Sequence, residues 1–247
     1  MNITPGYEIP VLDHGFVRYI DHMGSDQRIV EAARISYKSP GKGEEADKKL
    51  LHYLWKNAHS SPFEFPKITL NMKMPIFVMR QYIRHRTQAV GEVSARYTEL
   101  PDEFYWPTRW RRQDVKNKQG SVGGDDFNPN LLDESQVFGT TGEDVIITAD
   151  MALRHHCGVS YDLYKAMMEA GIAREMARMV LPLNIYTEFY AVWDLKNLLH
   201  FVKLREDAHA QAEIQEYGRA IKAILVELFP WTMEAYEKFK FVLKEVE

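Results

Sequence analysis

Hydrophobic and polar residues alternate most regularly in residues 67–74, which read KITLNMKM. The four apolar side chains share one side and the polar ones the other, as in a strand with one buried face. Residues 9–20 favour two short strands joined by a turn at Gly15, and residues 184–193 are rich in the aromatic and β-branched side chains typical of strands. The pattern therefore predicts a small sheet assembled from distant parts of the chain.

Apolar residues spaced three or four apart predict helices over much of the remaining chain. The predicted helices run from Ser25 or Asp26 to about Ser36, over 44–57 with Leu50, Leu51, Leu54 and Trp55 as the buried stripe, from Pro75 to Arg86, over 143–170, over 173–180, and over 194–242 as two or three helices with a junction at Pro230. Residues 101–142 show no sustained periodicity. We expect one domain over 1–247, α+β in class, with a small mixed or antiparallel sheet flanked by long helices and a long loop over 108–142.

Composition narrows the class of protein. The 247 residues carry a net charge of −4, which argues against a general nucleic-acid coat, because such a coat needs a basic excess. The single cysteine, Cys157, suits a reducing compartment. No secretory signal and no apolar run of about 18 residues is visible. We expect a soluble cytoplasmic protein that does not enter a membrane.

The first candidate site is RHRTQAVGEVSARY, residues 84–97, a basic segment in an acidic chain. Arg84 and Arg86 are two residues apart, so they point to different sides of a helix, and at a helix end they would spread outward. Ser94 and Arg96 would share one side of an extended loop and could hold a phosphate. The alternative is a solvated basic helix end favoured by the helix dipole.

Two further segments could carry chemistry. In HSSPFEF, residues 59–65, a histidine, two hydroxyls and a glutamate lie together, although taken alone the segment is better explained as a cap and turn. Asp207 and His209 could bind a metal, but their spacing matches no zinc pattern.

Two other patterns are set aside. GKGEEA, residues 41–46, imitates a dinucleotide fingerprint but follows a predicted helix rather than a strand. His155, His156 and Cys157 diverge by about 100° per residue on a helix, and Cys157 falls on its apolar stripe. The sequence therefore offers no activated nucleophile. In RWRR, residues 109–112, Trp110 lies among arginines as in nucleic-acid stacking surfaces, which leaves a nucleic-acid-binding protein as the alternative function.

The segment RHRTQAVGEVSARY resembles the signature of the flavin-dependent thymidylate synthases, in which arginine, histidine and arginine precede glutamate, serine and arginine at fixed spacing. Further matching segments follow the family order along nearly the whole chain: ARISY (33–37), HSSPFEF (59–65), PIFVMRQYIRHR (75–86), KNKQGS (116–121), AREMARMVLPLNIYTEF (173–189) and DLKNLLHFVKLREDAHAQAEIQEYG (194–218).

The resemblance implies an FAD enzyme without a Rossmann fold, forming a homotetramer with active sites shared between subunits. Its substrates would be deoxyuridine monophosphate (dUMP), methylenetetrahydrofolate and NADPH, and its products thymidylate and tetrahydrofolate. Reduced flavin would supply the hydride, no cysteine would attack the pyrimidine, and no metal is implied.

By position, the resemblance assigns residues to each ligand. The implied FAD contacts are Ser61, Arg84, His85, Arg86, Glu92, Asp194, Lys196 and His200, with Leu195 in the same stretch and His59 and Glu64 shaping the pocket. The implied dUMP contacts are Gln81, Arg84, Glu92, Ser94, Arg96, Arg178 and Arg205, with Ser94 and Arg96 near the phosphate. Arg205 is the implied catalytic residue, a cation that stabilises negative charge on the pyrimidine.

Two positions depart from the family signature, which often has serine at Ala89 and asparagine at Gly91. Ala89 has no hydroxyl to donate, and Gly91 removes an amide and gives the expected loop more freedom. The departures concern the detailed flavin contacts rather than the reaction.

Overall fold

A five-stranded sheet is the largest β-structure of the computed structural model, which describes residues 3–35, 41, 43–123, 126–133 and 146–239. Its order is β1-β2-β3-β9-β4, and the pairs β1–β2, β2–β3 and β4–β9 are antiparallel. The strands are β1 (Glu8–Val11), β2 (Gly15–Met23), β3 (Lys67–Pro75), β4 (Gln88–Glu92) and β9 (Tyr186–Asp194). The strands predicted over 9–20, 67–74 and 184–193 are confirmed, but the turn predicted at Gly15 lies at residues 12–14, because Gly15 already begins β2. Strands β3 and β9 are neighbours despite their distance along the chain.

The chain divides into two compact units. The first comprises Met1–Lys73, Arg80–Glu92 and Glu188–Glu247, and the second Met74–Met79 and Val93–Thr187. The boundaries fall inside β3, β9 and the helix α3 (Ile76–Tyr82), and directly after β4. The single domain over 1–247 stays a prediction.

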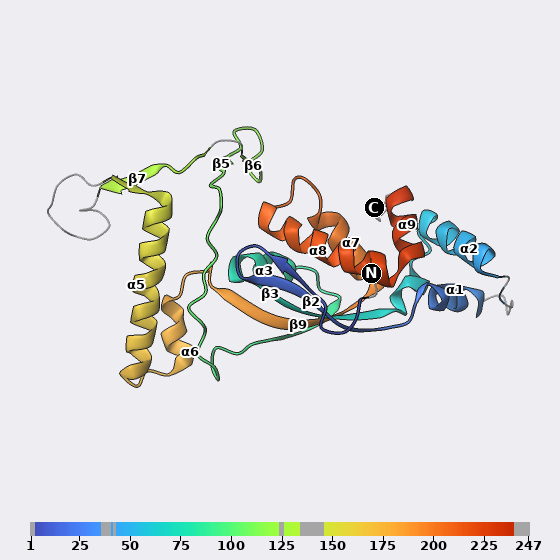
Figure 1. Cartoon of the computed structure of the whole chain (residues 1–247), viewed down its shortest axis with the longest axis horizontal. Coiled ribbons are helices and arrows are strands. Elements are labelled where there is room, and N and C mark those ends of the chain that lie inside the picture. The colour runs from blue at the N-terminus through green and yellow to red at the C-terminus, as the bar shows by residue number, and fades with distance from the viewer. Residues whose placement is uncertain (1–2, 36–40, 42, 124–125, 134–145, 240–247) are drawn as a thin grey trace. The chain divides into compact units, whose positions relative to one another are not determined.

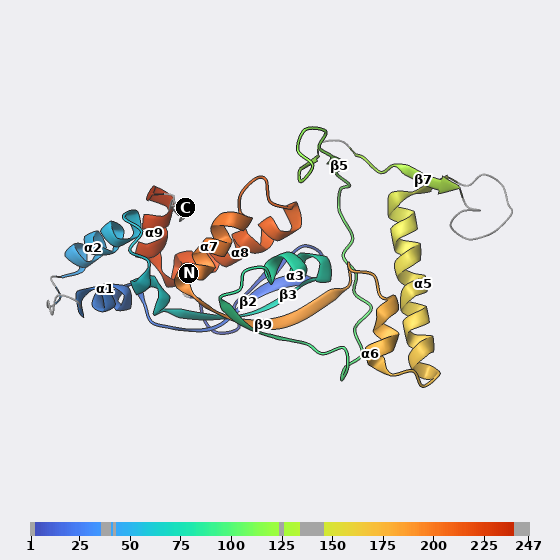
Figure 2. The same ribbon diagram turned by 180° about the vertical axis from the view of Figure 1, so that it is seen from behind.

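Helices cover one face of the sheet in the first unit. Figures 1 and 2 show α7 and α8 along the sheet, and α2 side by side with α9. The helical segments of this unit are α1 (Asp26–Arg34), α2 (Glu44–Lys56), the 3-10 turn η2 (Ser61–Glu64), α7 (Leu195–Arg205), α8 (Ala212–Leu228) and α9 (Pro230–Phe239). The helices predicted over 44–57 and after Asp194, with a junction at Pro230, are confirmed.

The covered face of the sheet is apolar because side chains alternate along each strand. Val17 of β2, Leu70 of β3 and Trp193 of β9 are all buried. The ring centroid of Trp193 lies 5.9 Å from that of Phe201 on α7. Burying each such side chain contributes about 1.5–3 kcal/mol, so this contact fixes α7 on the sheet.

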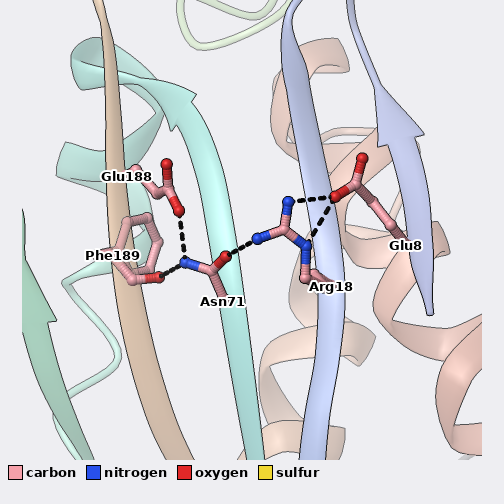
Figure 3. Close-up of polar contacts among 5 residues, drawn as sticks. All are labelled: Glu8, Arg18, Asn71, Glu188 and Phe189. Carbon is pink, nitrogen blue, oxygen red and sulfur yellow. Dashed lines mark hydrogen bonds and ion pairs between the residues drawn. The ribbon is translucent and has the colours of Figure 1, made fainter. Parts of the chain in front are cut away.

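A polar network crosses the opposite face (Figure 3). Arg18 of β2 donates through Nε to Oε2 of Glu8 on β1 at 2.8 Å, and through Nη1 to Oδ1 of Asn71 on β3 at 2.7 Å. The Asn71 amide donates to Oε1 of Glu188 at 3.0 Å and to the Phe189 carbonyl at 3.3 Å, both on β9. Asn71 is fully buried, so the prediction that the whole polar side of β3 faces solvent is wrong at this residue.

A buried carboxylate joins α1 to α9. Asp26, 4% exposed, accepts hydrogen bonds from the amides of Trp231 at 2.8 Å and Thr232 at 3.2 Å, and from the Thr232 hydroxyl at 2.6 Å. Ser25 occupies the N-cap position of α1, but its side chain makes no cap hydrogen bond. Asp26 therefore serves the beginning of α9 rather than that of its own helix.

The second unit contains one long helix and a small core of its own. Leu100, Phe104, Cys157 and Ile185 form one buried cluster. Figures 1 and 2 show α6 beside α5. The elements of this unit are β5 (Arg112–Gln113), β6 (Ser121–Val122), β7 (Asn130–Asp133), β8 (Ile146–Thr148), α5 (Ala149–Glu169), α6 (Arg174–Ala177) and the 3-10 turn η3 (Arg178–Val180).

Two predicted helix boundaries are wrong. The helix predicted from Pro75 to Arg86 begins at Ile76 and ends at Tyr82, because Pro75 is still part of β3. The helix predicted over 143–170 begins at Ala149, since residues 146–148 form β8 and the Thr148 hydroxyl accepts from the Met151 amide as an N-cap. Residues 143–145 lie outside the described part of the chain.

Candidate active site

The Arg84–His85–Arg86 stretch forms a turn directly after α3. The Arg84 amide donates to the Gln81 carbonyl at 3.3 Å, and the His85 amide donates to the Tyr82 carbonyl at 3.2 Å. Arg84 and Arg86 are exposed, while His85 is half-buried. The helix ends before the basic residues, so His85 alone of the three turns towards the interior.

Tyr82 holds this turn against the sheet and α7. The side chain of Tyr82 is fully buried, and its hydroxyl accepts a hydrogen bond from Nε1 of Trp193 at 2.6 Å. Its ring lies 5.0 Å from the ring of Phe189 and 5.2 Å from that of Phe201. Aromatic contacts of this kind stabilise by about 0.5–1.5 kcal/mol beyond area burial, so the turn has a rigid support.

The central contact of the first unit joins His85 to Arg205. Nε of Arg205 donates to Nε2 of His85 at 3.1 Å, and the imidazole packs edge-on against the ring of Phe201 at 4.9 Å. The contact links residues that lie 120 positions apart. It brings the predicted catalytic arginine onto the predicted flavin-binding turn.

The protonation state of His85 follows from this geometry. Burial lowers the pKa of His85 to about 4, and the nearby charges of Arg205 and His200 add to the shift. The imidazole is therefore neutral at neutral pH, and because Nε2 accepts, its proton resides on Nδ1. Burial also lowers the pKa of Arg205, but a guanidinium keeps its charge at neutral pH.

At the beginning of α7, Asp194 and Lys196 already have partners. Oδ1 of Asp194 accepts from the Asn197 amide at 2.9 Å as the N-cap of the helix, and both carboxylate oxygens accept from the Asn197 side chain. Nζ of Lys196 lies 2.9 Å from Oε1 of Glu64, which ties α7 to η2. Ser61 is the exposed first residue of η2.

A pocket of about 200 Å³ lies among α2, α7 and α9. His200 projects from α7 into this region, and its buried Nδ1 has no hydrogen-bond partner within the described part of the chain. Burial and the charges of Lys203, Lys196 and Arg205 lower the pKa of His200. The lining residues are Trp55, Lys196, Asn197, Leu199, His200, Lys203 and Tyr236. Sequence reasoning missed Lys203, although its place seven residues after Lys196 on one helix face was a usable signal.

The segment after the turn is a strand rather than a loop. Residues Gln88–Glu92 form β4 and pair with β9, Gly91 lying opposite Tyr190 and Glu92 opposite Phe189. Because Gly91 is paired within a strand, the loop freedom expected of this glycine is wrong. No described atom lies within 4 Å of a Cβ added at Gly91, so a side chain fits there. Glu92 is exposed at the end of the strand.

Gln81 is also held in place. Its side-chain amide donates to the side-chain oxygen of Gln211, just before α8. Thus Gln81, His85 and Arg205 are connected within the first unit by contacts to α7 and the segment that follows it.

Ser94, Arg96 and Arg178 belong to the second unit. The amides of Tyr97 and Thr98 donate to the Ser94 carbonyl, so the predicted extended loop is wrong and these residues form a turn. The Arg96 amide donates to the Ser94 hydroxyl oxygen at 3.3 Å. The Ser94 side chain thus hydrogen-bonds to the backbone of Arg96, a local interaction that the two-residue spacing of Ser94 and Arg96 did not reveal.

Arg96 is paired with a carboxylate. Its Nε lies 2.8 Å from Oε2 of Glu175, and both side chains are about half exposed. An exposed pair of this kind contributes about 0–1 kcal/mol, so it would not prevent Arg96 from binding an anion. Arg178 is exposed at the beginning of η3, three residues after Glu175.

No group of three or more metal-ligating side chains occurs among the residues that the structure describes. Asp207 and His209, the metal candidates of the sequence, bind each other at 2.8 Å through Oδ1 and Nδ1. Within the described ranges, no helix combines the length and the apolar character needed to cross a membrane.

Comparison with known proteins gives a consistent result. Residues 18–231 match the model of the family described as thymidylate synthase complementing protein. The chain is 47% identical over 230 residues to a flavin-dependent thymidylate synthase of Thermus thermophilus, covering 93% of this chain and 78% of the relative. It is 41% identical over 243 residues to that of Thermosipho melanesiensis, covering 97% and 99% respectively.

Solved structures agree. The UMP/dUMP methylase PolB of Streptomyces cacaoi, bound with 5-Br dUMP, matches at a TM-score of 0.76 and 30% identity over 95% of this chain and 99% of that one. The same methylase bound with 5-Br UMP matches at a TM-score of 0.75 and 31% identity, covering 95% and 98%.

The protein is therefore an enzyme of the methyltransferase class, as these similarities, the fold and the connected site residues together indicate. The chain belongs to the flavin-dependent thymidylate synthase family.

Proposed function

We propose that this enzyme methylates dUMP reductively to thymidylate, using FAD, methylenetetrahydrofolate as one-carbon donor and NADPH as reductant, and releases tetrahydrofolate. The observation that carries the proposal is the hydrogen bond between Arg205 and neutral His85, which joins the family signature to α7. The family match over residues 18–231 and the likeness to a dUMP methylase support the substrate.

The residues around α7 fit a flavin in their chemistry. His200 offers a buried nitrogen without a partner among the described residues, and Lys196 and Lys203 offer charge to anionic groups of the cofactor. When bound, FAD supplies the hydride that completes the methyl group. We infer that the turn Arg84–His85–Arg86, Ser61, Glu92, Asp194, Lys196 and His200 hold it. Because Asp194 already caps α7, its contribution would be to fix the helix on which Lys196 and His200 lie.

Arg205 would act on the pyrimidine by charge. A fixed guanidinium in a half-buried position stabilises negative charge that develops on the ring, and a preorganised donor costs little reorganisation during the reaction. His85 accepts from Nε, and among the described residues no partner takes the remaining N–H groups of Arg205, which would be available to the nucleotide.

The remaining dUMP contacts would be the polar side chains that the resemblance assigns to the nucleotide: Gln81, Arg84, Glu92, Ser94, Arg96 and Arg178. Arg96 and Ser94 suit the phosphate, because a guanidinium and a hydroxyl both donate to phosphate oxygens. The exposed Arg96–Glu175 pair would open when the nucleotide binds.

The chain offers no cysteine nucleophile for the pyrimidine. Cys157 is the single cysteine of the sequence and is fully buried, and its thiol hydrogen-bonds with the Asn184 side chain. Burial raises the pKa of the thiol, which disfavours the reactive thiolate. This supports hydride transfer without a covalent enzyme–substrate bond.

We further propose that the protein is a cytoplasmic homotetramer with shared active sites, that each chain is one domain, and that FAD binds without a Rossmann fold. The antiparallel pairs of the sheet support the last point, as does the position of Gly41 and Gly43 between two helices. Exposed apolar side chains on α5, Met151, Val159 and Leu163, support assembly.

The nucleic-acid alternative gains no support from the similar proteins. In the RWRR segment, the Arg112 guanidinium lies 3.8 Å from the ring centroid of Phe127, and Nε of Arg111 donates to the Ser121 hydroxyl at 3.0 Å. These two arginines are engaged within their own unit.

The direct test is an assay of the purified protein with FAD, methylenetetrahydrofolate, NADPH and dUMP. We expect thymidylate to form, and NADPH oxidation to accelerate when dUMP is added. A protein that takes up no FAD, or oxidises NADPH without forming thymidylate, would contradict the proposal. Arg205→Ala should retain FAD and lose most thymidylate formation, because the charge that stabilises the ring is gone.

A further inference from the structure

Arg205 occupies the last position of α7, where the helix itself gives little support. Glu206 is the C-cap, and its amide donates to the Val202 carbonyl at 2.8 Å. Carbonyls at the end of a helix lack intrahelical partners. The direction in which Arg205 points therefore depends on what holds the residue after it.

Gly218 of α8 approaches this helix end at backbone distance. A Cβ added at Gly218 would lie 3.3 Å from the carbonyl carbon of Arg205 and 3.3 Å from the amide nitrogen of Glu206. Such distances are tighter than ordinary van der Waals contact, and the atoms met are backbone atoms that cannot turn away. The absence of a side chain at Gly218 thus allows α8 to pack directly on the last turn of α7.

The carboxylate of Glu206 is held by two other helices. The Tyr236 hydroxyl of α9 donates to Oε1 at 2.8 Å, and Nζ of Lys222 on α8 lies 2.9 Å from Oε2. Lys222 follows Gly218 by four residues, so both lie on one face of α8. Lys222 also pairs with Glu237. Burial would lower the pKa of Lys222, but its hydrogen bonds with Glu237 and Glu206 outweigh that effect, and the pKa is raised.

At the far end of the Arg205 side chain, the guanidinium is held by its hydrogen bond to His85. A long side chain with a free backbone would sample many orientations, since arginine carries about 2 kcal/mol of rotamer entropy. Support at both the backbone and the guanidinium restricts it to one.

We propose that Glu206 is a positioning residue for Arg205 in the reaction with dUMP. Lys222 and Tyr236 hold the Glu206 carboxylate, and Gly218 packs against the backbone between Arg205 and Glu206. Glu206 itself touches no reacting atom. The proposal rests on the proposed function, since Arg205 must contact the nucleotide for its position to matter.

The test is a double-mutant cycle on dUMP affinity, measured by titration calorimetry with the FAD-loaded protein. Glu206→Ala should raise the dUMP Kd about ten- to a hundredfold in the wild-type background, because a small misplacement of a charged group is costly. In the Arg205→Ala background the same change should have an effect of less than about twofold. Lys222→Met should behave like Glu206→Ala, and Lys222→Arg should restore most of the affinity.

The matched control is Glu216→Ala, which removes an exposed carboxylate that pairs with Arg219 on the same helix. It should leave the dUMP Kd unchanged in both backgrounds. The positioning role would be overturned if Glu206→Ala weakened dUMP binding equally in the wild-type and Arg205→Ala backgrounds. It would also be overturned if Glu206→Ala left the dUMP Kd unchanged in the wild-type background. If Glu206→Ala does not fold, Glu206→Gln and Lys222→Met decide. Wild-type protein that binds no dUMP would refute the proposed function, and this proposal with it.

Discussion

At the scale of single residues, His85 and Arg205 determine each other's state. Burial, together with the cation of Arg205 beside the imidazole, lowers the pKa of His85, and the neutral imidazole in turn accepts the hydrogen bond that orients the cation. Neither residue would have this role alone. The contact therefore couples a protonation state to a geometry.

The low pKa of His85 has a consequence for stability. In the unfolded chain a histidine titrates near about 6.5, whereas His85 in the fold has a pKa of about 4. As pH falls through this window, the unfolded chain binds a proton that the folded one does not, so the free energy of unfolding should fall between about pH 6.5 and pH 4. His85→Phe should lose part of this acid sensitivity in urea unfolding at about pH 7 and about pH 4.5.

His156→Phe on the exposed side of α5 is the control for this comparison and should keep the wild-type pH dependence. If His85→Phe and wild type lost stability in parallel on acidification, His85 would not be the group concerned.

The sequence alone did not reveal the geometry that joins the predicted site residues. The resemblance named His85 and Arg205, but no spacing rule joins positions 120 residues apart. Ser94 and Arg96 lie in a turn because local hydrogen bonds compete with an extended backbone. All the ligand contacts that were assigned by position, among them those of Ser61, Glu92 and Arg178, stay predictions.

At the scale of elements, a carboxylate from one helix can complete another. Asp26 provides the hydrogen-bond acceptor for the first turn of α9, and both its oxygens are used. Burial raises the pKa of Asp26, while the bonds from Thr232 and Trp231 oppose that shift. The carboxylate thus remains in place because three donors face it.

Removing that acceptor should destabilise the fold. We expect Asp26→Ala to lower the free energy of unfolding by about 3 kcal/mol, because the amides of Trp231 and Thr232 would be left without partners. Asp26→Asn, which keeps one acceptor oxygen, should lose less. Asp21→Ala, an exposed change on β2, should have little effect in the same denaturation experiment. A loss at Asp26 no greater than that at Asp21 would show that α9 does not depend on this carboxylate.

The elements that sequence reasoning found are those with strong local signals. Strict alternation gave β3, and apolar spacing gave α2, with Leu51, Leu54 and Trp55 buried and Leu50 only partly so. Strand β4 was missed because Gln88–Glu92 contains alanine, glycine and glutamate, which have low strand propensity. Its structure comes from pairing with β9, a long-range interaction that no local pattern encodes.

At the scale of the whole molecule, the exposed apolar side chains of α5 bear on the proposed assembly. Val159 and Leu163 are about half exposed and lie four residues apart on one side of the helix, and Met151, also half exposed, lies about 80° from Val159 around the helix axis. An isolated apolar side chain at a surface is ordinary, but a row of them along a long helix favours burial against another copy of the chain.

A charge in this row should disrupt the assembly. Val159→Asp should shift the particle mass in analytical ultracentrifugation from that of a tetramer to that of smaller species, since a buried carboxylate without a partner is strongly unfavourable. Lys165→Ala changes the net charge by the same amount on α5, about 120° away around the helix axis, and should leave the mass unchanged. A Val159→Asp protein of unchanged mass would exclude this face of α5 as an interface.

The polar network of Figure 3 also favours the correct register of the strands in the sheet. Glu8, Arg18, Asn71 and Glu188 come from four different strands, and each hydrogen bond forms only when two strands are aligned correctly. A slip of β3 by a single residue would turn Asn71 towards the apolar side and leave the guanidinium of Arg18 without its amide partner. Misaligned sheets are thereby penalised at several strands at once, in addition to the apolar burial that the same slip would lose.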